Sequence, residues 1–246
     1  MNTYKYIFFI LLIFLPQTSQ AGWSDFVSDI KKTVKQKAGV STTSTLSEDK
    51  IIAGLKQALN QGVEKSVKQL GTRNGFLKDA SVKIPMPHTL KNLDRGLRII
   101  GQNKLADKFI NTMNHAAEKA VPETLDILVS AVKSMTLKDA VKILNGEDDA
   151  ATQYFKRNSM SELRIVIKPI VHKATNKVGL TNAYKKMINK AGYLARYIDK
   201  DSLDIDQYVT NKTIDGLFMK IAVEEKRIRK DPVARTTDLL KDVFGG

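Results

Sequence analysis

Residues 47–71 read SEDKIIAGLKQALNQGVEKSVKQLG, and this stretch decides the fold class. Its apolar side chains recur every three or four residues from Ile51 to Leu70, which is the spacing of one face of an α-helix. Gly71 follows directly, and glycine is the residue that most often ends a helix. The stretch therefore predicts one long helix with one buried face.

Helical spacing returns along the rest of the chain. The segments that show it are 89–100, 105–120, 122–135, 180–194 and 214–228. Asp231-Pro232 offers an N-cap and a first-turn proline for one more helix. No repeat and no Pro/Gly/Ser-rich linker divides these segments, so we expect one all-α domain over 47–246, a multi-helix bundle with short connections.

Two stretches depart from helical spacing. Between Gly71 and Pro87, glycine and proline predict an ordered loop or one short strand. Residues 163–167 alternate in polarity, but we interpret them as helix with a kink at Pro169. Thr136 and Ser159 each precede an acidic residue by three positions, which predicts that each caps the start of a helix.

The chain opens like an exported protein. Lys5 is followed by an apolar run over 7–15, which is shorter than the roughly 20 residues that cross a bilayer as a helix. Small side chains at Ser19 and Ala21 suit a signal peptidase, so we predict that residues 1–21 are a signal peptide cleaved after Ala21. The alternative is a retained anchor.

Residues 22–40 predict a short basic amphipathic helix, and the Ser/Thr-rich residues 41–46 predict a linker to the domain. An apolar face flanked by lysines is typical of a helix that lies on an anionic membrane. The residues expected to touch the membrane are Trp23, Phe26, Ile30, Lys31 and Lys35. The alternative is that this helix packs on its own domain.

Composition limits the function classes. The chain has no cysteine, which excludes a lipoprotein anchor, disulfides and thiolate metal sites. Lysine and arginine exceed the acidic residues by 14, so the surface attracts polyanions. In an exported protein these are acidic lipids, lipopolysaccharide or cell-wall polymers, and we expect no nucleic-acid partner. The alternative is that the charge serves solubility alone.

Several segments of the sequence together resemble a bacterial envelope family, the one catalogued as domain of unknown function 4197. They are Gly54–Leu59, Met113–Glu118, Gly146–Phe155 and the tail from Tyr208, with Asp215–Phe218, Glu224–Lys226, Ile228-Arg229 and Asp231–Thr237 as its most specific parts. The resemblance covers about residues 46–245. It implies an exported helical protein of Gram-negative bacteria, and it implies no activity and no catalytic residue.

Three clusters could carry chemistry. Asn114, His115 and Glu118 form a polar cluster on one helix, and a histidine three residues from a glutamate is also a metal-ligand spacing. We favour a polar pair bonded to nearby backbone over a metal site. No catalytic nucleophile motif, phosphate loop or cofactor signature accompanies the cluster, so no metal and no cofactor is expected.

The other two clusters are charged. Arg227, Arg229 and Arg235 are candidates to bind an anion, although pairing with neighbouring acids or helix ends is the favoured alternative. The acidic run 147–149 precedes a helical stretch, and we interpret it as a cap for that helix rather than as an acid–base pair.

The sequence thus predicts a periplasmic, non-enzymatic binding or scaffold protein of the envelope that contacts anionic membrane or a hydrophobic ligand. Two alternatives stay open. One is an enzyme that acts on an envelope component through a cleft around His115, and the other is an adaptor that binds another envelope protein.

Overall fold

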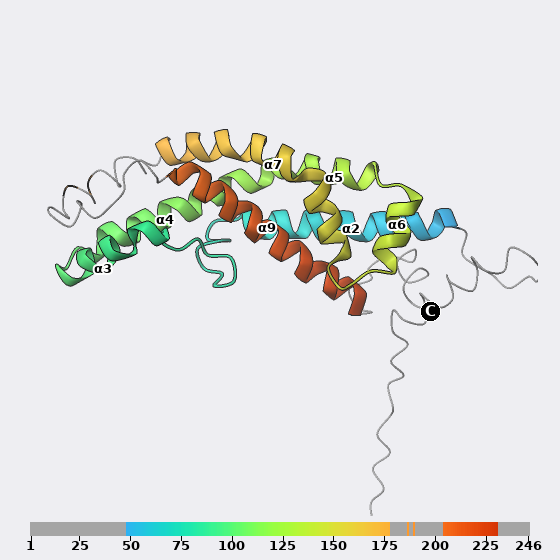
Figure 1. Cartoon of the computed structure of the whole chain (residues 1–246), viewed down its shortest axis with the longest axis horizontal. Helices are drawn as coiled ribbons and strands as arrows, with labels where there is room; N and C mark the ends of the chain where they lie inside the picture. Colours follow the sequence, from blue (N-terminus) through green and yellow to red (C-terminus); the bar gives the residue numbers. More distant parts are fainter. Residues whose placement is uncertain (1–47, 178–185, 187–188, 190–203, 231–246) are drawn as a thin grey trace, which may run out of the picture.

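The computed structural model describes residues 48–177, 186, 189 and 204–230, and these residues form helices joined by turns and loops (Figure 1). The α-helices are α2 (Glu48–Gly71), α3 (Lys91–Ile99), α4 (Asn103–Ala120), α5 (Leu125–Lys133), α6 (Leu137–Leu144), α7 (Ala150–Lys177) and α9 (Ile205–Lys230). Two 3₁₀ turns, His88–Leu90 and Val121–Thr124, precede α3 and α5. No strand occurs among the described residues, and the predicted all-α fold is confirmed.

The described part is elongated (Figure 1). The long helices α2, α4, α7 and α9 pack on one another along its length, and α5 and α6 cover one end. At the opposite end α3 folds back on α4, so that the two helices form a projecting hairpin.

The core consists of the apolar faces that the sequence predicts. Buried side chains from α2 and α9 interleave with those of α4 and α7, and this burial is the main favourable term for folding. From α2 and α9 they are Leu55, Leu59, Val63, Val67, Leu70, Ile214, Leu217, Phe218, Ile221 and Ile228.

One of the two predicted caps is confirmed. The amide of Asp139 donates to Thr136 Oγ1 at 3.2 Å, and the Asp139 carboxylate accepts from the Thr136 amide at 3.1 Å. This reciprocal capping box starts α6.

The predicted cap at Ser159 is wrong. Ser159 is 1% exposed and lies inside α7, which began nine residues earlier at Ala150. A capping pattern is local, so it can also occur inside a helix that began earlier. The interpretation of 163–167 as helix is confirmed, and α7 continues through Pro169. Proline leaves the carbonyl of Ile165 without its helical donor, but Ile165 is on the exposed side of α7, where water can bond to it.

Other predictions lie outside the described residues. These are the signal peptide 1–21, the amphipathic segment 22–40 with Trp23, Phe26, Ile30, Lys31 and Lys35, the linker 41–46, and the last helix from Asp231 with Arg235. Of the predicted helix 180–194, residues 186 and 189 are described, and both are helical. None of the described helices has the length and apolar character needed to span a membrane.

Candidate functional site

The predicted polar cluster holds the segment between α2 and α3. Asn114 is fully buried on α4, and its Oδ1 accepts from the Ile84 amide at 2.8 Å. Its Nδ2 donates to the carbonyls of Ile84, at 2.9 Å, and of Ile110, at 2.8 Å. The amide side chain thus pairs with the extended backbone at Ile84 as a neighbouring strand would.

Glu118 lies one helical turn after Asn114 and holds the same segment further upstream. Its Oε1 accepts from the amides of Phe76 and Leu77, both at 3.2 Å, and its Oε2 lies 2.7 Å from His115 Nδ1. We call Asn114, His115 and Glu118 the polar clamp. Asn114 and Glu118 bond to backbone, and His115 bonds to Glu118, so the clamp positions the 72–87 segment. This is the arrangement that the sequence favoured over a metal site.

The candidate anion-binding arginines of α9 bond within the protein. Arg229 is buried, and its Nη2 donates to Glu225 Oε1 at 2.8 Å and to the Ile143 carbonyl at 2.9 Å. Arg227 Nε donates to Glu224 Oε2 at 2.8 Å. These contacts tie α9 to the end of α6, and they do not bring Arg227 and Arg229 to one open site.

The start of α7 is capped by a distant residue. Glu225 accepts from the amides of Ala151, at 2.8 Å, and Thr152, at 2.9 Å, and from the Thr152 hydroxyl. Among the adjacent acids, Asp148 pairs with Lys230 at 2.7 Å, and this hydrogen bond lowers the pKa of Asp148. Asp149 accepts from the Gln153 side chain. The expectation that residues 147–149 accept the free amides of Ala151 and Thr152 is therefore wrong, because a glutamate of α9 reaches these amides instead.

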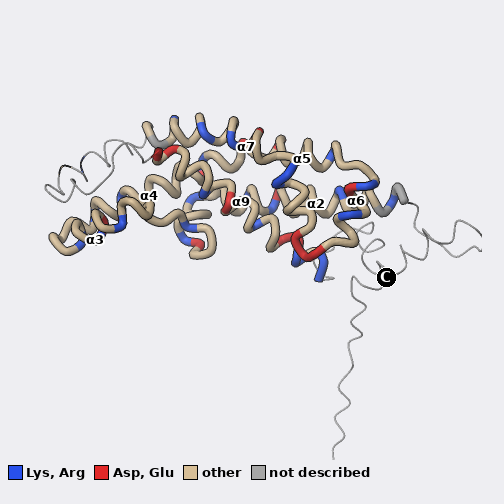
Figure 2. The backbone as a smooth tube through the Cα atoms, viewed as in Figure 1, with Lys and Arg blue, Asp and Glu red and all other residues tan. Residues whose placement is uncertain are grey.

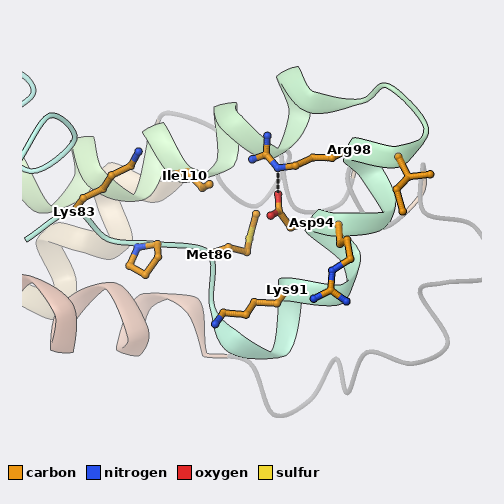
Figure 3. Close-up of a pocket in the computed structure, with 9 residues that line it drawn as sticks. Lys83, Met86, Lys91, Asp94, Arg98 and Ile110 are labelled. Carbon is orange, nitrogen blue, oxygen red and sulfur yellow. Dashed lines mark hydrogen bonds and ion pairs between the residues drawn. The ribbon is translucent and has the colours of Figure 1, made fainter. Parts of the chain in front are cut away.

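An open groove of about 830 Å³ lies between the 83–86 segment, α3 and α4 (Figure 3). Met86 and Ile110 line it beside Pro85 and Ile99, so its wall is largely apolar. The charged residues around it are Lys83, Lys91, Asp94, Arg95 and Arg98. The polar clamp helps to shape the groove, because Asn114 fixes the backbone of Ile84 between the lining residues Lys83 and Pro85.

The groove is basic, and three of its cations have no acidic partner among the residues that the structure describes. Arg98 donates to Asp94 at 3.0 Å and to Asp107 at 2.9 Å, and the bond with Asp107 raises the pKa of Arg98. Among the described residues, no carboxylate lies within ion-pair distance of Lys83, Lys91 or Arg95. All three side chains are on exposed residues, so they are available to an anion.

Sequence reasoning missed this groove, although one signal was present. Lys91, Arg95 and Arg98 are spaced four and three residues apart, which places them on one face of α3. Figure 2 shows lysine and arginine residues on α3 and on the other described helices. The 83–86 segment contacts this face only in the folded chain, so no local sequence pattern predicts the contact.

Residues 45–245 match the family model described as "Protein of unknown function (DUF4197)". The chain belongs to this family. No curated protein and no solved structure matches the chain.

Segments that carry the DUF4197 resemblance coincide with structural contacts. Met113–Glu118 contains the polar clamp, and Gly146–Phe155 contains the start of α7 that Glu225 caps. The tail signature around Glu224 and Arg229 supplies this cap and its buried ion pair. These parts of the signature therefore define how the helices are held together.

Proposed function

We propose that this DUF4197 protein is a non-enzymatic binding protein of the bacterial envelope, and that its groove holds an amphiphile with an acyl-type chain and an anionic head. The observation that supports this most directly is the set of cations Lys83, Lys91 and Arg95 beside an apolar wall, for which the described part of the chain offers no ion-pair partner. The apolar wall can contact the chain of such a ligand, and the cations can bind its anionic head.

The dimensions and charge of the groove favour this ligand class. A volume of about 830 Å³ lies within the range of small-molecule sites, which is about 300–1,000 Å³. Met86 and Ile110 offer apolar contact for a chain, and the cations can bind a phosphate or carboxylate. A neutral or cationic head would leave this charge without compensation.

The polar clamp supports binding rather than catalysis. Asn114 and Glu118 are buried, and Glu118 holds His115 through its second carboxylate oxygen. A general acid or base must reach the substrate, and these groups reach the backbone at Phe76, Leu77 and Ile84 instead. Asn114 and Glu118 are therefore engaged in positioning the backbone, which is the reason that this proposal favours a binding protein over the enzyme alternative.

Export and membrane contact by the N-terminal segment belong to the same proposal. A signal peptide at 1–21 would place the mature protein in the periplasm, and N-terminal sequencing of the exported protein should begin at Gly22. If residues 22–40 anchor the protein, their deletion should weaken its co-sedimentation with acidic vesicles. If the deletion leaves vesicle binding unchanged, the alternative that this segment packs on its own domain is favoured.

Calorimetric titration with dodecyl phosphate tests the groove. The chain should bind dodecyl phosphate and should not bind dodecyltrimethylammonium, which has the same chain and the opposite charge. Lys91→Glu/Arg95→Glu should weaken the binding by at least about tenfold, because two head-group contacts become repulsive. Equal binding of the two detergents, or no binding of either, would refute the proposal.

The control variant is Lys68→Glu/Lys138→Glu. Both of these lysines are exposed and lie outside the groove, and the double substitution changes the net charge by the same amount. It should keep the affinity within about twofold, since exposed charges far from a site are screened. A similar loss in both variants would show that net charge, and not the groove, attracts the ligand.

A further inference from the structure

The turn of the α3–α4 hairpin exposes two adjacent isoleucines. Ile99 is 79% exposed and Ile100 is 54% exposed. The other large exposed apolar side chains of the described residues do not include a second pair of sequence neighbours. This turn lies at one end of the elongated bundle, where α3 and α4 project (Figure 1).

Backbone hydrogen bonds fix the shape of this turn. The Gln102 amide donates to the Leu97 carbonyl at 2.8 Å, and the Gly101 amide donates to the Arg98 carbonyl at 3.1 Å. Gly101 has φ +76°, so the turn is a complete Schellman motif that ends α3. The two isoleucines are therefore held outward by an ordered turn rather than by a loose loop.

Positive charge surrounds the isoleucines on both helices. Residues 91–108 contain five cations and two acids, which gives a net charge of +3. Both acids, Asp94 and Asp107, bind Arg98. Lys104 and Lys108 on α4 are exposed, and within the described part of the chain neither has an ion-pair partner. Unpaired cations thus flank the apolar pair from α3 and from α4.

We infer that this turn inserts into the surface of an anionic phospholipid bilayer. Ile99 and Ile100 enter below the head groups, while Arg95 and Lys104 contact lipid phosphates. An apolar tip ringed by cations is the combination that favours binding at an anionic membrane interface. A fluid bilayer closes around a convex tip, whereas a protein partner would need a matching hollow.

The inference goes beyond the proposed function, and the two can fail separately. Ile99 belongs to both surfaces because it also lines the groove, so insertion would bring the groove to the membrane surface. Ile100 belongs to the turn and does not line the groove. An Ile100→Ser variant that loses vesicle binding but still binds dodecyl phosphate would therefore support insertion independently of the ligand.

Vesicle co-sedimentation of the full mature chain tests the inference. The vesicles are phosphatidylcholine alone or phosphatidylcholine mixed with phosphatidylglycerol. The chain should bind the mixed vesicles, and Ile99→Ser/Ile100→Ser should lower the partition coefficient by at least about tenfold. Measurements on the same variants without residues 22–40 separate the turn from the N-terminal segment.

The matched control is Ile165→Ser/Val223→Ser. Ile165 is 73% exposed on α7 and Val223 is 54% exposed on α9, so the pair removes similar apolar surface elsewhere. This control should keep the partition coefficient, and both variants should melt as the parent does, because all four side chains are exposed. Equal loss in both variants, or unchanged vesicle binding of the isoleucine variant, would overturn the inference.

Discussion

Gly216 lies where α9 approaches the loop that follows α2. A Cβ at this position would come within 2.7 Å of the Phe76 ring and 3.3 Å of Val82 Cβ. The Phe76 ring is fully buried, so it has little room to move. This close approach gives a physical reason for a glycine at position 216.

We therefore predict that Gly216→Ala destabilises the protein by about 1–3 kcal/mol through overpacking. Urea unfolding measures the change. Gly62→Ala on α2 is the control, because its Cβ would meet Ile228 and Glu224 at ordinary distances of 3.5 and 3.6 Å. That substitution should stabilise the helix by about 0.5–1 kcal/mol. Equal effects of the two substitutions would contradict this interpretation of Gly216.

Asp79 joins the same loop to α9 through a charge. Its carboxylate binds Lys220 Nζ and also accepts from the Ser81 hydroxyl at 2.6 Å. The hydrogen bond from Lys220, and then that from Ser81, lowers the pKa of Asp79 in the folded state. The stabilisation is present above the unfolded-state pKa of about 3.9 and is lost as pH falls through the lower folded-state value.

Asp79→Asn should accordingly lower the free energy of unfolding by about 1–2 kcal/mol at pH 7. The difference from the parent should shrink as pH falls below about 4, where the parent carboxylate also becomes neutral. Denaturation curves at several pH values measure this. Asp215→Asn removes the same charge from an exposed side chain and should change stability by less than about 0.5 kcal/mol. A difference that persists at low pH would mean that Asp79 acts by packing.

The cap of α7 shows how one element depends on another. Glu225 and Arg229 form a pair on α9 whose side chains are almost fully buried, and Glu225 also accepts the free amides of Ala151 and Thr152. Breaking a buried pair by removing one charge leaves the other uncompensated. The start of α7 would also lose its cap and the negative charge that complements its dipole.

Glu225→Gln should therefore destabilise the protein by about 3 kcal/mol, because Gln cannot neutralise Arg229. In a domain of this size the melting temperature should fall by about 6–12 °C. Thermal unfolding followed by circular dichroism measures this fall. Asp148→Asn breaks solvent-exposed bonds to Lys226 and Lys230 and should cost less than about 1 kcal/mol. If the two variants melt alike, Glu225 does not stabilise the fold as proposed.

At the scale of elements, the sequence predicted the features that follow from helical periodicity. It missed the contacts between residues that lie far apart in the chain. The apolar stripes of α2, α4 and α9 and the capping box at Thr136 follow from local spacing, and each is confirmed. The supposed cap at Ser159 failed because helix α7 was already in progress. The contacts of Glu225 with α7 and of Asn114 with Ile84 join residues far apart in the chain, and no local pattern reveals them.

In the candidate site too, one part could be predicted from helical periodicity and another part could not. Lys91, Arg95 and Arg98 lie on one face by helical spacing, so the basic side of the groove was readable from the sequence. The apolar side of the groove could not be predicted from the sequence, because Met86 and Ile110 meet only when the polar clamp holds the 72–87 segment on α4. The clamp residues were singled out as a cluster, but their hydrogen bonds to backbone are what the structure adds.

The described bundle has a well-packed centre and a projecting end. Helix α9 packs on α2, α4 and α7, so it joins most of the bundle, whereas α3 packs mainly on α4 (Figure 1). Amide hydrogens in a well-packed centre exchange only when the whole domain unfolds, whereas those of a peripheral element exchange through local opening. Helix α3 carries both the groove cations and the exposed isoleucines, so the proposed contacts lie on the peripheral part.

Hydrogen exchange followed by mass spectrometry should therefore show slow, global exchange in α2 and α9 and faster exchange in α3. Dodecyl phosphate should slow the exchange of α3 and of the 83–86 segment, because a ligand that binds only the folded groove stabilises it, and the stabilisation increases with ligand concentration. Lys91→Glu/Arg95→Glu should remove this effect and leave α9 unchanged. Equal protection of α3 and α9 without ligand would contradict the assignment of α3 to the peripheral part of the bundle.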